Sequence, residues 1–235
     1  MLSIITPVLN GLKFIENNIN AISRLDIPHE HIIVDGGSTD GTLDIIDNYS
    51  DIILIHQTEN TGMYGAVSLG FKYSKGSLLT YINCDDLVIK NGFEDLYNYS
   101  VNNIYDLIYS NAIFYYFEKG IKKRSKANRF AHFFLRKGYM PFSQPCSIFT
   151  KEIYERVGGL RYDMFKICGD LDLFQRFSLE KAKIKYLPIE TILYSKYGSS
   201  FGTINKDLHM VELQLLTLNS KSIFNNFLFS IARFL

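Results

Sequence analysis

Apolar residues follow two alternating spacings along roughly the first 80 positions of the chain. Ile15, Ile19 and Ile22 recur every three or four residues, which predicts an amphipathic helix. The apolar runs between such segments are short and rich in β-branched residues, which predicts strands. The predicted strands cover 2–6, 32–34, 52–56 and 78–82, and the predicted helices cover 15–22, 42–49 and 63–74. Because strands that alternate with helices pair in parallel between helix layers, we expect an α/β fold with a mostly parallel, Rossmann-like sheet.

The second half of the chain is less regular. An apolar, aromatic run over 106–117 precedes Lys119-Gly120, which favours a hairpin turn, and Gly158-Gly159 is expected to end a helix. The predicted helices cover 93–99, 151–157, 171–182 and 208–218, and the further strands cover 146–149, 184–187 and 191–194. We expect one domain over 1–205, divided into halves 1–110 and 111–205, followed by a small C-terminal helical extension over 206–235.

Composition and charge narrow the class of protein. Of the 235 residues, 47% are hydrophobic, which is enough for one sizeable core. The formal net charge of +1 argues against a nucleic-acid-binding protein, which would carry a basic excess. Cys84, Cys146 and Cys168 lack CxxC spacing, which indicates free thiols in a reducing compartment. Because the chain shows neither a signal-peptide pattern nor an apolar run of about 20 residues, we expect a cytoplasmic protein.

Polar side chains follow three of the predicted strands. Pro7 has no N–H to donate and is expected to end the first strand. The polar residue Asn10 follows shortly after it. Asp35 ends the second strand at the Gly36-Gly37 turn, and Asp85-Asp86 follows the fourth. The carboxyl ends of parallel strands share one sheet edge, where open α/β folds bind ligands. We therefore expect these side chains to open onto one site.

Asp85 and Asp86 are adjacent carboxylates, which repel each other unless a cation lies between them and a partner. Mg²⁺ and Mn²⁺ take oxygen ligands and usually bind through one or two carboxylates plus substrate phosphates. The pair is therefore a candidate metal site. The alternative is a solvated loop pair that caps the following helix.

Asp170 and Asp172 lie at the start of a predicted helix, in the run Cys168-Gly169-Asp170-Leu171-Asp172. Negative charge is favoured at a helix N-terminus, so simple capping explains both residues. The functional alternative is that one of them is a general base, which must reach the proton that it removes and have a suitable pKa. Spacing alone leaves open which of the two enters a site.

Three further features each allow a functional and a structural interpretation. The segment 122–137 interleaves basic and aromatic residues, and it fits either anionic lipid headgroups and acceptor phosphates or an exposed loop. The tail over 222–235 is amphipathic, which fits either peripheral contact with a membrane surface or packing onto the domain. His209 is either a metal ligand or an ordinary histidine of the surface or core.

Four motifs occur in order along the chain. They are Thr6-Pro7-Val8-Leu9-Asn10, Asp35-Gly36-Gly37-Ser38-Thr39-Asp40-Gly41-Thr42, Asn83-Cys84-Asp85-Asp86 and Gly169-Asp170-Leu171-Asp172-Leu173. With them the chain resembles the family 2 glycosyltransferases, which have the GT-A fold, over roughly residues 1–200. The resemblance is greatest to bacterial enzymes that build polysaccharide or O-antigen repeat units. The resemblance implies a metal-dependent enzyme that transfers a sugar with inversion of its anomeric configuration. The donor would be a nucleotide-sugar, usually a UDP-sugar, and the acceptor a hydroxyl of a glycan or polyprenyl-linked saccharide.

The resemblance also implies roles for the donor-binding residues, and it makes 1–110 the nucleotide-sugar-binding half. The backbone at Thr6, Pro7 and Val8 and the side chain of Asp35 would hold the base, since a carboxylate accepts from a ring N–H. Asp86 would hold Mg²⁺ or Mn²⁺ on the diphosphate, and Asp85 would contact ribose or sugar. The remaining predicted donor-binding residues are Asn10, Gly62 and Asn83, and His209 stays a candidate second metal ligand.

In the acceptor-binding half, 111–205, Asp170 matches the base that deprotonates the acceptor hydroxyl. A single base opposite the leaving group implies in-line attack and inversion at the anomeric carbon. Gln144 and Asp172 are the implied acceptor-binding residues. The chain departs from the family pattern at Gly65 and Gly169, where relatives often carry other residues. The Asn83-Cys84-Asp85-Asp86 sequence also leaves open which carboxylate holds the metal.

Two other functions compete with this one. A sugar-1-phosphate nucleotidylyltransferase shares a Rossmann-like sheet and a metal, but it needs a Gly-rich, basic phosphate loop that residues 7–13 do not supply. A non-catalytic nucleotide-sugar-binding protein would have no need of both acidic motifs. Release of nucleoside diphosphate in the presence of Mn²⁺ discriminates an enzyme from a binder.

Overall fold

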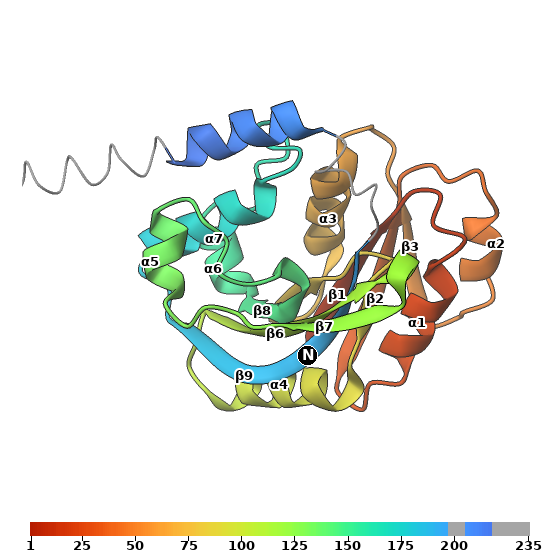
Figure 1. The fold of residues 1–235 in the computed structure, drawn as a ribbon. Coiled ribbons are helices and arrows are strands. Elements are labelled where there is room, and N and C mark those ends of the chain that lie inside the picture. The colour runs from red at the N-terminus through yellow and green to blue at the C-terminus, as the bar shows by residue number, and fades with distance from the viewer. Residues whose placement is uncertain (197–204, 218–235) are drawn as a thin grey trace, which may run out of the picture.

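The computed structural model of the chain describes residues 1–196 and 205–217. Within them, one nine-stranded sheet has helices on both faces (Figure 1). The strands are β1 (Leu2–Val8), β2 (His29–Asp35), β3 (Ile52–His56), β4 (Leu78–Tyr81), β5 (Leu87–Val88), β6 (Leu107–Tyr116), β7 (Ile121–Ser125), β8 (Ser147–Thr150) and β9 (Ile184–Lys196). The helices are α1 (Ile15–Ser23), α2 (Thr42–Ile46), α3 (Gly62–Tyr73), α4 (Lys90–Asn102), α5 (Ala131–Arg136), α6 (Lys151–Arg156) and α7 (Gly169–Leu179), and one more covers 206–217. The predicted amphipathic tail over 222–235 lies outside the described residues.

The sheet has the strand order β3-β2-β1-β4-β8-β6-β9-β5, with β7 paired to β6. The first three strands along the chain pair only in parallel, as their alternation with helices predicted, and β4 is parallel to β1. β8 is antiparallel to both of its neighbours, and β6 and β9 are parallel. The predicted α/β fold is therefore confirmed, and the antiparallel pairings all involve strands of the less regular second half or the short β5.

β1 extends past Pro7, so the prediction that this proline ends the strand is wrong. The amide of Ile82 donates to the carbonyl of Ile5 at 2.9 Å, which shows that Ile5 faces β4. Pro7 is two residues further on and faces the same side, where β4 has already ended at Tyr81. Because no ladder hydrogen bond is required there, the missing N–H is tolerated. The extension brings Val8 level with Asp35.

The two short strands predicted over 184–187 and 191–194 are one strand, β9. Its pairing with β6 shifts register between Tyr109 and Ala112, opposite the stretch that contains Pro188. Such an irregularity accommodates a proline without ending the strand, because the residues there leave the hydrogen-bond ladder. The predicted hairpin is confirmed, with Tyr116 paired to Ile121 and Gly120 at a φ of 61°.

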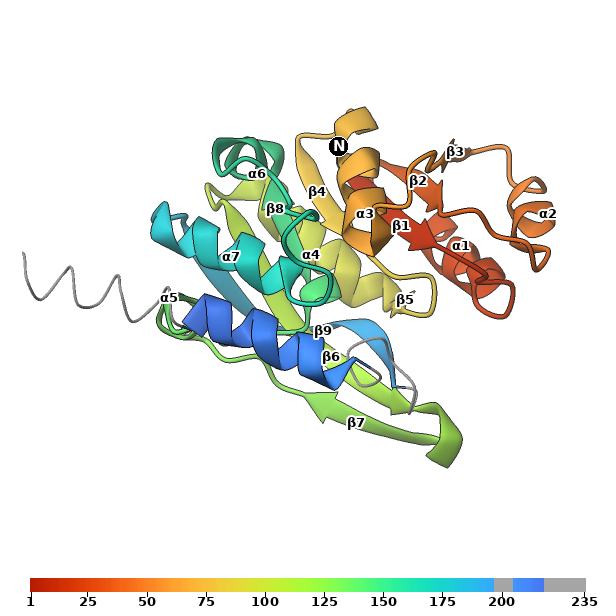
Figure 2. The same cartoon turned by 90° about the horizontal axis from the view of Figure 1, so that it is seen from above.

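Two helix layers sandwich the sheet, as Figures 1 and 2 show. On one face, residues of α3, α6 and α7 pack on the sheet in an aromatic-rich cluster that contains Phe71, Phe149 and Phe174. On the other face, α1 and α4 bury Ile22 and Phe93. The helix over 206–217 joins the first cluster through Leu216, which is fully buried. This helix therefore belongs to the same layer as α7.

The predicted helix stop at Gly158-Gly159 is also confirmed, because both glycines follow α6 with positive φ values of 80° and 70°. Among the described residues, no helix has the length and apolar character that crossing a membrane requires.

Candidate functional site

Asp35 occupies the carboxyl end of β2, where it organises the following turn. Its carboxylate accepts hydrogen bonds from the amides of Gly37 at 2.9 Å and Ser38 at 3.1 Å. Gly37 has a φ of 97°, a conformation that strongly favours glycine. The amide of Gly36 donates to the carbonyl of Val8 at 2.8 Å, so the turn is fixed to the end of β1.

Asn10 joins the loop after β1 to the loop after β2. Its amide donates to the hydroxyl of Ser38 at 2.8 Å, and its side-chain oxygen accepts from the amide of Thr39 at 2.9 Å. Thr6 is buried, and its hydroxyl lies 2.9 Å from Nε2 of His31 and 3.3 Å from Oδ1 of Asn18. The side chain of Thr6 is thus engaged inside the protein.

Asp86 is 1% exposed, in the loop that follows β4. Its Oδ1 accepts from the amide of Ser195 at 2.9 Å, whereas its Oδ2 is buried and has no hydrogen-bond partner among the described residues. Oδ1 of Asn83 is buried and unpartnered in the same way. Burial, followed by the charge of Asp85, raises the pKa of Asp86 well above its ordinary value, and Lys196 opposes this shift.

Asn18 supports this loop and was missed by the sequence analysis. Its side-chain nitrogen donates to the carbonyls of Asp86 at 2.9 Å and Asn83 at 3.2 Å. The sequence did contain a signal, because Asn18 lies between Ile15 and Ile19 on the apolar face of α1. A polar side chain at a buried helical position requires hydrogen-bond partners, and here the partners are the loop carbonyls.

Asp170 lies in the first turn of α7 and is partly buried. The hydroxyl of Tyr64 lies 3.1 Å from its Oδ1 and 2.8 Å from the carbonyl of Ile167, and the amide of Leu171 donates to the same Oδ1 at 2.8 Å. Desolvation raises the pKa of Asp170, and the nearby His209 is among the groups that lower it. A carboxylate with a raised pKa is suited to accept a proton near neutral pH.

Two tyrosines connect the Asp85-Asp86 loop with Asp170. Burial and the charges of Asp86, Asp85 and Asp170 all raise the pKa of Tyr194, which lies on β9. The pKa of Tyr81 on β4 is raised by burial, and next by Asp170 and Tyr194. The acidic motifs, although far apart in sequence, therefore both act electrostatically on Tyr194. Gly11 lies between the loop after β2 and the loop after β4. Its amide donates to the hydroxyl of Thr42 at 2.9 Å, and a Cβ atom there would lie 3.1 Å from Sγ of Cys84.

Three of the expected site residues make contacts inside the protein. Gln144 is buried, and its side chain donates to the carbonyl of Tyr81 at 2.9 Å. Asp172 is 1% exposed and accepts from Nε of Arg161 at 3.1 Å and Nε of Arg176 at 3.0 Å. The Gly62 carbonyl accepts from Gln57 at 3.2 Å. The carboxylate of Asp172 is thus occupied by two guanidinium groups, which is the arrangement of a structural ion pair.

The residues near Asp86 fit a divalent cation bound together with a ligand. Residues 1–196 and 205–217 contain no group of three or more His, Cys, Asp and Glu side chains that could hold a metal by itself. They do contain the unpartnered oxygens of Asp86 and Asn83, which are hard donors for Mg²⁺ or Mn²⁺. Such a cation normally completes its shell with phosphate oxygens and water. His209 acts electrostatically on Asp170, while Asp85 and Lys196 act on Asp86.

The departures at Gly65 and Gly169 have structural reasons. A Cβ atom at Gly169 would lie 2.7 Å from the ring of Tyr64, so a side chain there would displace the tyrosine that contacts Asp170. A Cβ atom at Gly65 would clash with the side chain of Thr61. Both glycines therefore allow close packing around α3.

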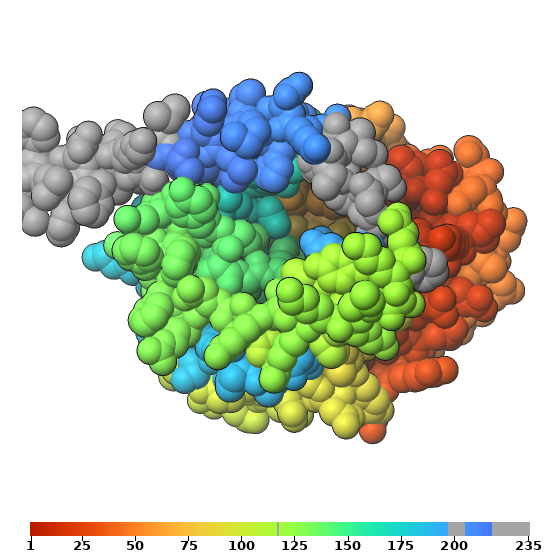
Figure 3. All heavy atoms as spheres, in the orientation of Figure 1, coloured from red at the N-terminus to blue at the C-terminus, as the bar shows by residue number. Residues whose placement is uncertain are grey.

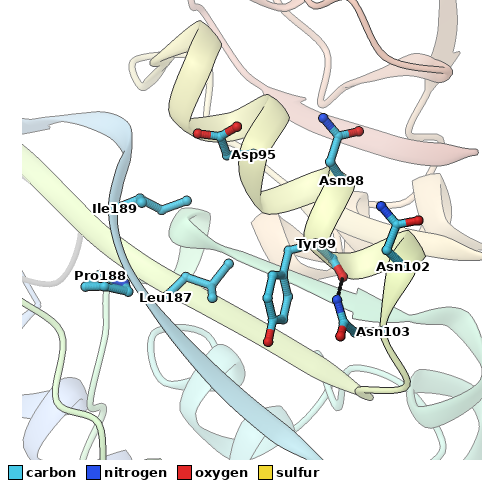
Figure 4. Close-up of a pocket in the computed structure, with 8 residues that line it drawn as sticks. All are labelled: Asp95, Asn98, Tyr99, Asn102, Asn103, Leu187, Pro188 and Ile189. Carbon is cyan, nitrogen blue, oxygen red and sulfur yellow. Dashed lines mark hydrogen bonds between the residues drawn. The ribbon is translucent and has the colours of Figure 1, made fainter.

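The surface is hollowed between the β6–β7 hairpin and the helix over 206–217, with α3 visible at the back (Figure 3). A second hollow, a groove of about 420 Å³, lies between α4 and β9 (Figure 4). Tyr99, Asn98 and Pro188 are among its lining residues. None of the predicted donor or acceptor residues lines this groove.

Two known bacterial glycosyltransferases are similar to this chain in sequence. The chain is 24% identical over 231 residues to the glycosyltransferase GlyG of Streptococcus pneumoniae, covering 88% of this chain and 75% of that protein. It is 25% identical over 191 residues to the poly(ribitol-phosphate) β-N-acetylglucosaminyltransferase TarP of Staphylococcus aureus, covering 78% of this chain and 51% of that protein. The chain thus spans three quarters of one relative and about half of the other.

Solved structures share the fold. Residues 1–349 of S. aureus TarS in complex with UDP superpose with a TM-score of 0.69 at 20% identity, covering 84% of this chain and 61% of that one. The mannosyltransferase PcManGT from Pyrobaculum calidifontis, in complex with GDP-Man and Mn²⁺, gives a TM-score of 0.63 at 18% identity, covering 86% of this chain and 58% of that one. The architecture is thus the GT-A fold of TarS.

The family model of glycosyl transferase family 2 matches residues 3–158. This match includes the loops after β1, β2 and β4 and therefore covers the Asp35 turn and the Asp85-Asp86 pair. On this match, together with the fold and its acidic sheet edge, the chain belongs to glycosyl transferase family 2.

Proposed function

We propose that the protein transfers a sugar from a UDP-sugar to a hydroxyl group of a glycan or lipid-linked acceptor, with inversion, in the synthesis of a bacterial surface polysaccharide. The observation that carries the proposal is that Asp86, with a buried and unpartnered oxygen, and Asp170, held by Tyr64, both act electrostatically on Tyr194 of β9. One acidic group is suited to proton transfer and the other to a cation-bound diphosphate. The names of TarP and of the UDP complex of TarS support the choice of donor and acceptor class.

The donor's base would bind at the Asp35 turn. The carboxylate of Asp35 lies at the sheet edge beside Val8, and it keeps accepting capacity beyond its bonds to Gly37 and Ser38. A ring N–H of uracil is a matching donor. The backbone of Asn10 and the preceding strand end would then border the nucleoside.

The diphosphate would lie toward the loop after β4. Asp86, with Asp85 or Asn83, would hold Mg²⁺ or Mn²⁺ there, and the cation would supply neutralising charge to the diphosphate. PcManGT, which carries Mn²⁺, supports this assignment. Asn18 and the amide of Ser195 hold the loop and the Asp86 carboxylate in place.

Asp170 would act as the general base. As the acceptor oxygen bonds to the anomeric carbon, the bond from that carbon to the diphosphate breaks, and the acceptor proton passes to Asp170. One displacement from the face opposite the leaving group inverts the anomeric configuration. The contacts from Tyr64 and the amide of Leu171 orient the carboxylate for this transfer.

Incubation of the protein with a panel of UDP- and GDP-sugars tests the proposal. We expect slow, Mn²⁺-stimulated release of UDP from one donor, and a loss of that release of about tenfold or more in Asp86→Asn. Asp95→Asn, which changes an exposed carboxylate in the groove between α4 and β9, is the matched control. Donor binding without release of nucleoside diphosphate would support the binding protein instead. Formation of a nucleoside triphosphate and a sugar 1-phosphate when pyrophosphate is added would support a nucleotidylyltransferase.

We also propose that the protein works at the cytoplasmic face of the membrane, through a basic aromatic surface. Residues 122–137 include seven Lys and Arg residues and no Asp or Glu, although the whole chain carries a net charge of only +1. Phe130 and Phe133 are 58% and 56% exposed, beside Arg129 and Lys137 respectively. Exposed aromatic rings next to cations suit a membrane interface with anionic headgroups.

Sedimentation with vesicles tests this surface. We expect binding to phosphatidylglycerol vesicles that weakens with added salt, and a severalfold loss of binding in the double variant Phe130→Ser, Phe133→Ser. Ile104→Ser, which removes a more exposed apolar residue elsewhere, is the control and should bind as the parent does. Deletion of 222–235, outside the described residues, should likewise shift the protein toward the soluble fraction. Equal binding by the double variant would contradict the assignment.

A further inference from the structure

Glu212 lies on the helix over 206–217 and is 2% exposed. Its carboxylate accepts three backbone hydrogen bonds, from the amides of Lys166 at 2.8 Å, Ile167 at 3.0 Å and Cys168 at 2.8 Å. These three amides are consecutive and immediately precede α7. A buried carboxylate that accepts several N–H bonds holds its partners strongly, because each bond is charge-assisted.

The segment held by Glu212 leads directly to Asp170. Cys168 is the N-terminal flanking residue of α7, and Asp170 follows two positions later. On the other side, the hydroxyl of Tyr64 contacts both the carbonyl of Ile167 and the carboxylate of Asp170. Ile167 is therefore held from two directions. Its backbone N–H donates a hydrogen bond to Glu212, and its carbonyl accepts one from the hydroxyl of Tyr64.

The helix that carries Glu212 is itself anchored. Leu216 is fully buried in the cluster that includes Phe174 and Phe177 of α7, and its carbonyl lies 3.4 Å from the side-chain nitrogen of Gln175. Glu212 and Leu216 are one helical turn apart and so share a face. The family match ends at residue 158, so this helix and its contact with the Asp170 loop lie outside it.

We propose that Glu212 is a positioning residue for the transfer reaction, through which the C-terminal helix fixes the loop that presents Asp170. The proposal rests on the proposed function, in which Asp170 is the base. Displacing a catalytic group by about 1 Å can cost 10²-fold in rate, so release of this loop lowers the transfer rate. Donor binding at the strand ends of β1, β2 and β4 does not involve the loop.

Glu212→Gln is the informative variant. A glutamine retains the size of the side chain but replaces one acceptor oxygen by an NH₂ group, which faces backbone N–H donors and cannot accept from them. We expect kcat to fall by about 10- to 100-fold while the Kd for UDP with Mn²⁺ stays within about twofold. The acid limb of the pH–rate profile should also move to lower pH, because a loosened loop exposes Asp170 to water and removes part of the desolvation that raises its pKa.

Asp207→Asn is the matched control, since it changes an exposed carboxylate on the same helix. Hydrogen exchange without substrate provides a test that does not depend on the enzyme assay. Amides of 166–170 should exchange faster in Glu212→Gln than in the control, with the core strands unchanged. If the parent protein transfers no sugar but this exchange difference is seen, the proposed function fails while the holding role of Glu212 stands.

Unchanged exchange at 166–170, or a kcat equal to that of the control, would overturn the proposal. A parallel loss of UDP binding and kcat would overturn it too, because that pattern indicates general unfolding. If Glu212→Gln does not fold, Glu212→Asp retains the charge on a shorter side chain. That variant should then show a smaller fall in kcat with unchanged UDP affinity, and a kcat equal to the parent's would count against the proposal.

Discussion

Asp170→Asn is expected to lower the rate of sugar transfer by about 10²- to 10⁴-fold, the usual contribution of a general base, while leaving UDP affinity intact. Asparagine has the same shape, and its oxygen can still accept from the amide of Leu171. It cannot take the proton of the acceptor hydroxyl. Single-turnover transfer and calorimetric titration with UDP and Mn²⁺ measure the two quantities. Transfer at the parental rate would exclude Asp170 as the base.

The same substitution is expected to stabilise the protein at neutral pH. The pKa of Asp170 is raised in the folded state, so folding is penalised where the unfolded carboxyl is charged. This penalty is absent below the ordinary pKa of about 3.9 and reaches its full size above the raised pKa. The gain in Tm of Asp170→Asn should therefore be present at about pH 7 and disappear near about pH 3. Transfer by the parent should rise with pH through the raised pKa, because the base works when deprotonated.

Asp172→Asn is expected to destabilise the fold by about 3–5 kcal/mol, because it leaves two guanidinium groups without their carboxylate. Loss of the ion pair with Arg176 should account for more of this destabilisation than loss of the pair with Arg161. The Arg176 side chain is only 15% exposed, whereas that of Arg161 is 38% exposed. For a chain of this size, each kcal/mol corresponds to roughly 2–4 °C in Tm. Thermal and urea unfolding measure the loss.

This variant also tests the role of Asp172 that the family resemblance implied. If Asp172 bound the acceptor, the substitution would raise the KM for the acceptor and leave Tm nearly unchanged. The ion pairs with Arg161 and Arg176 predict the reverse, a large fall in Tm with a nearly parental KM for the folded fraction. Glu152→Gln, which breaks an exposed pair with Arg156, is the control and should change stability by less than about 1 kcal/mol.

The parallel half of the sheet and the family could both be predicted from the order of residues along the chain. Local spacing determines whether a segment is a strand or a helix, and strands that alternate with helices leave few possible topologies. The carboxylates at strand ends were predictable for the same reason, because parallel strands bring their carboxyl ends to one edge. Asp35 accordingly ends β2, and the Asp85-Asp86 loop follows β4; both strands pair with β1.

The contacts of the individual acidic residues, in contrast, could not be predicted before the fold was known. Asp170 and Asp172 have the same charge and similar positions in sequence, but one contacts Tyr64 beside the site and the other lies between two arginines. Those partners are set by packing, and no local pattern encodes which side chain meets which. The same reason explains why Asn18 and Glu212 were missed, since each acts on a loop far away in sequence. The spacing of apolar residues determines which segments become strands or helices and which strand ends meet at one edge of the sheet. The hydrogen-bond partners of a buried polar group depend instead on how those strands and helices pack together.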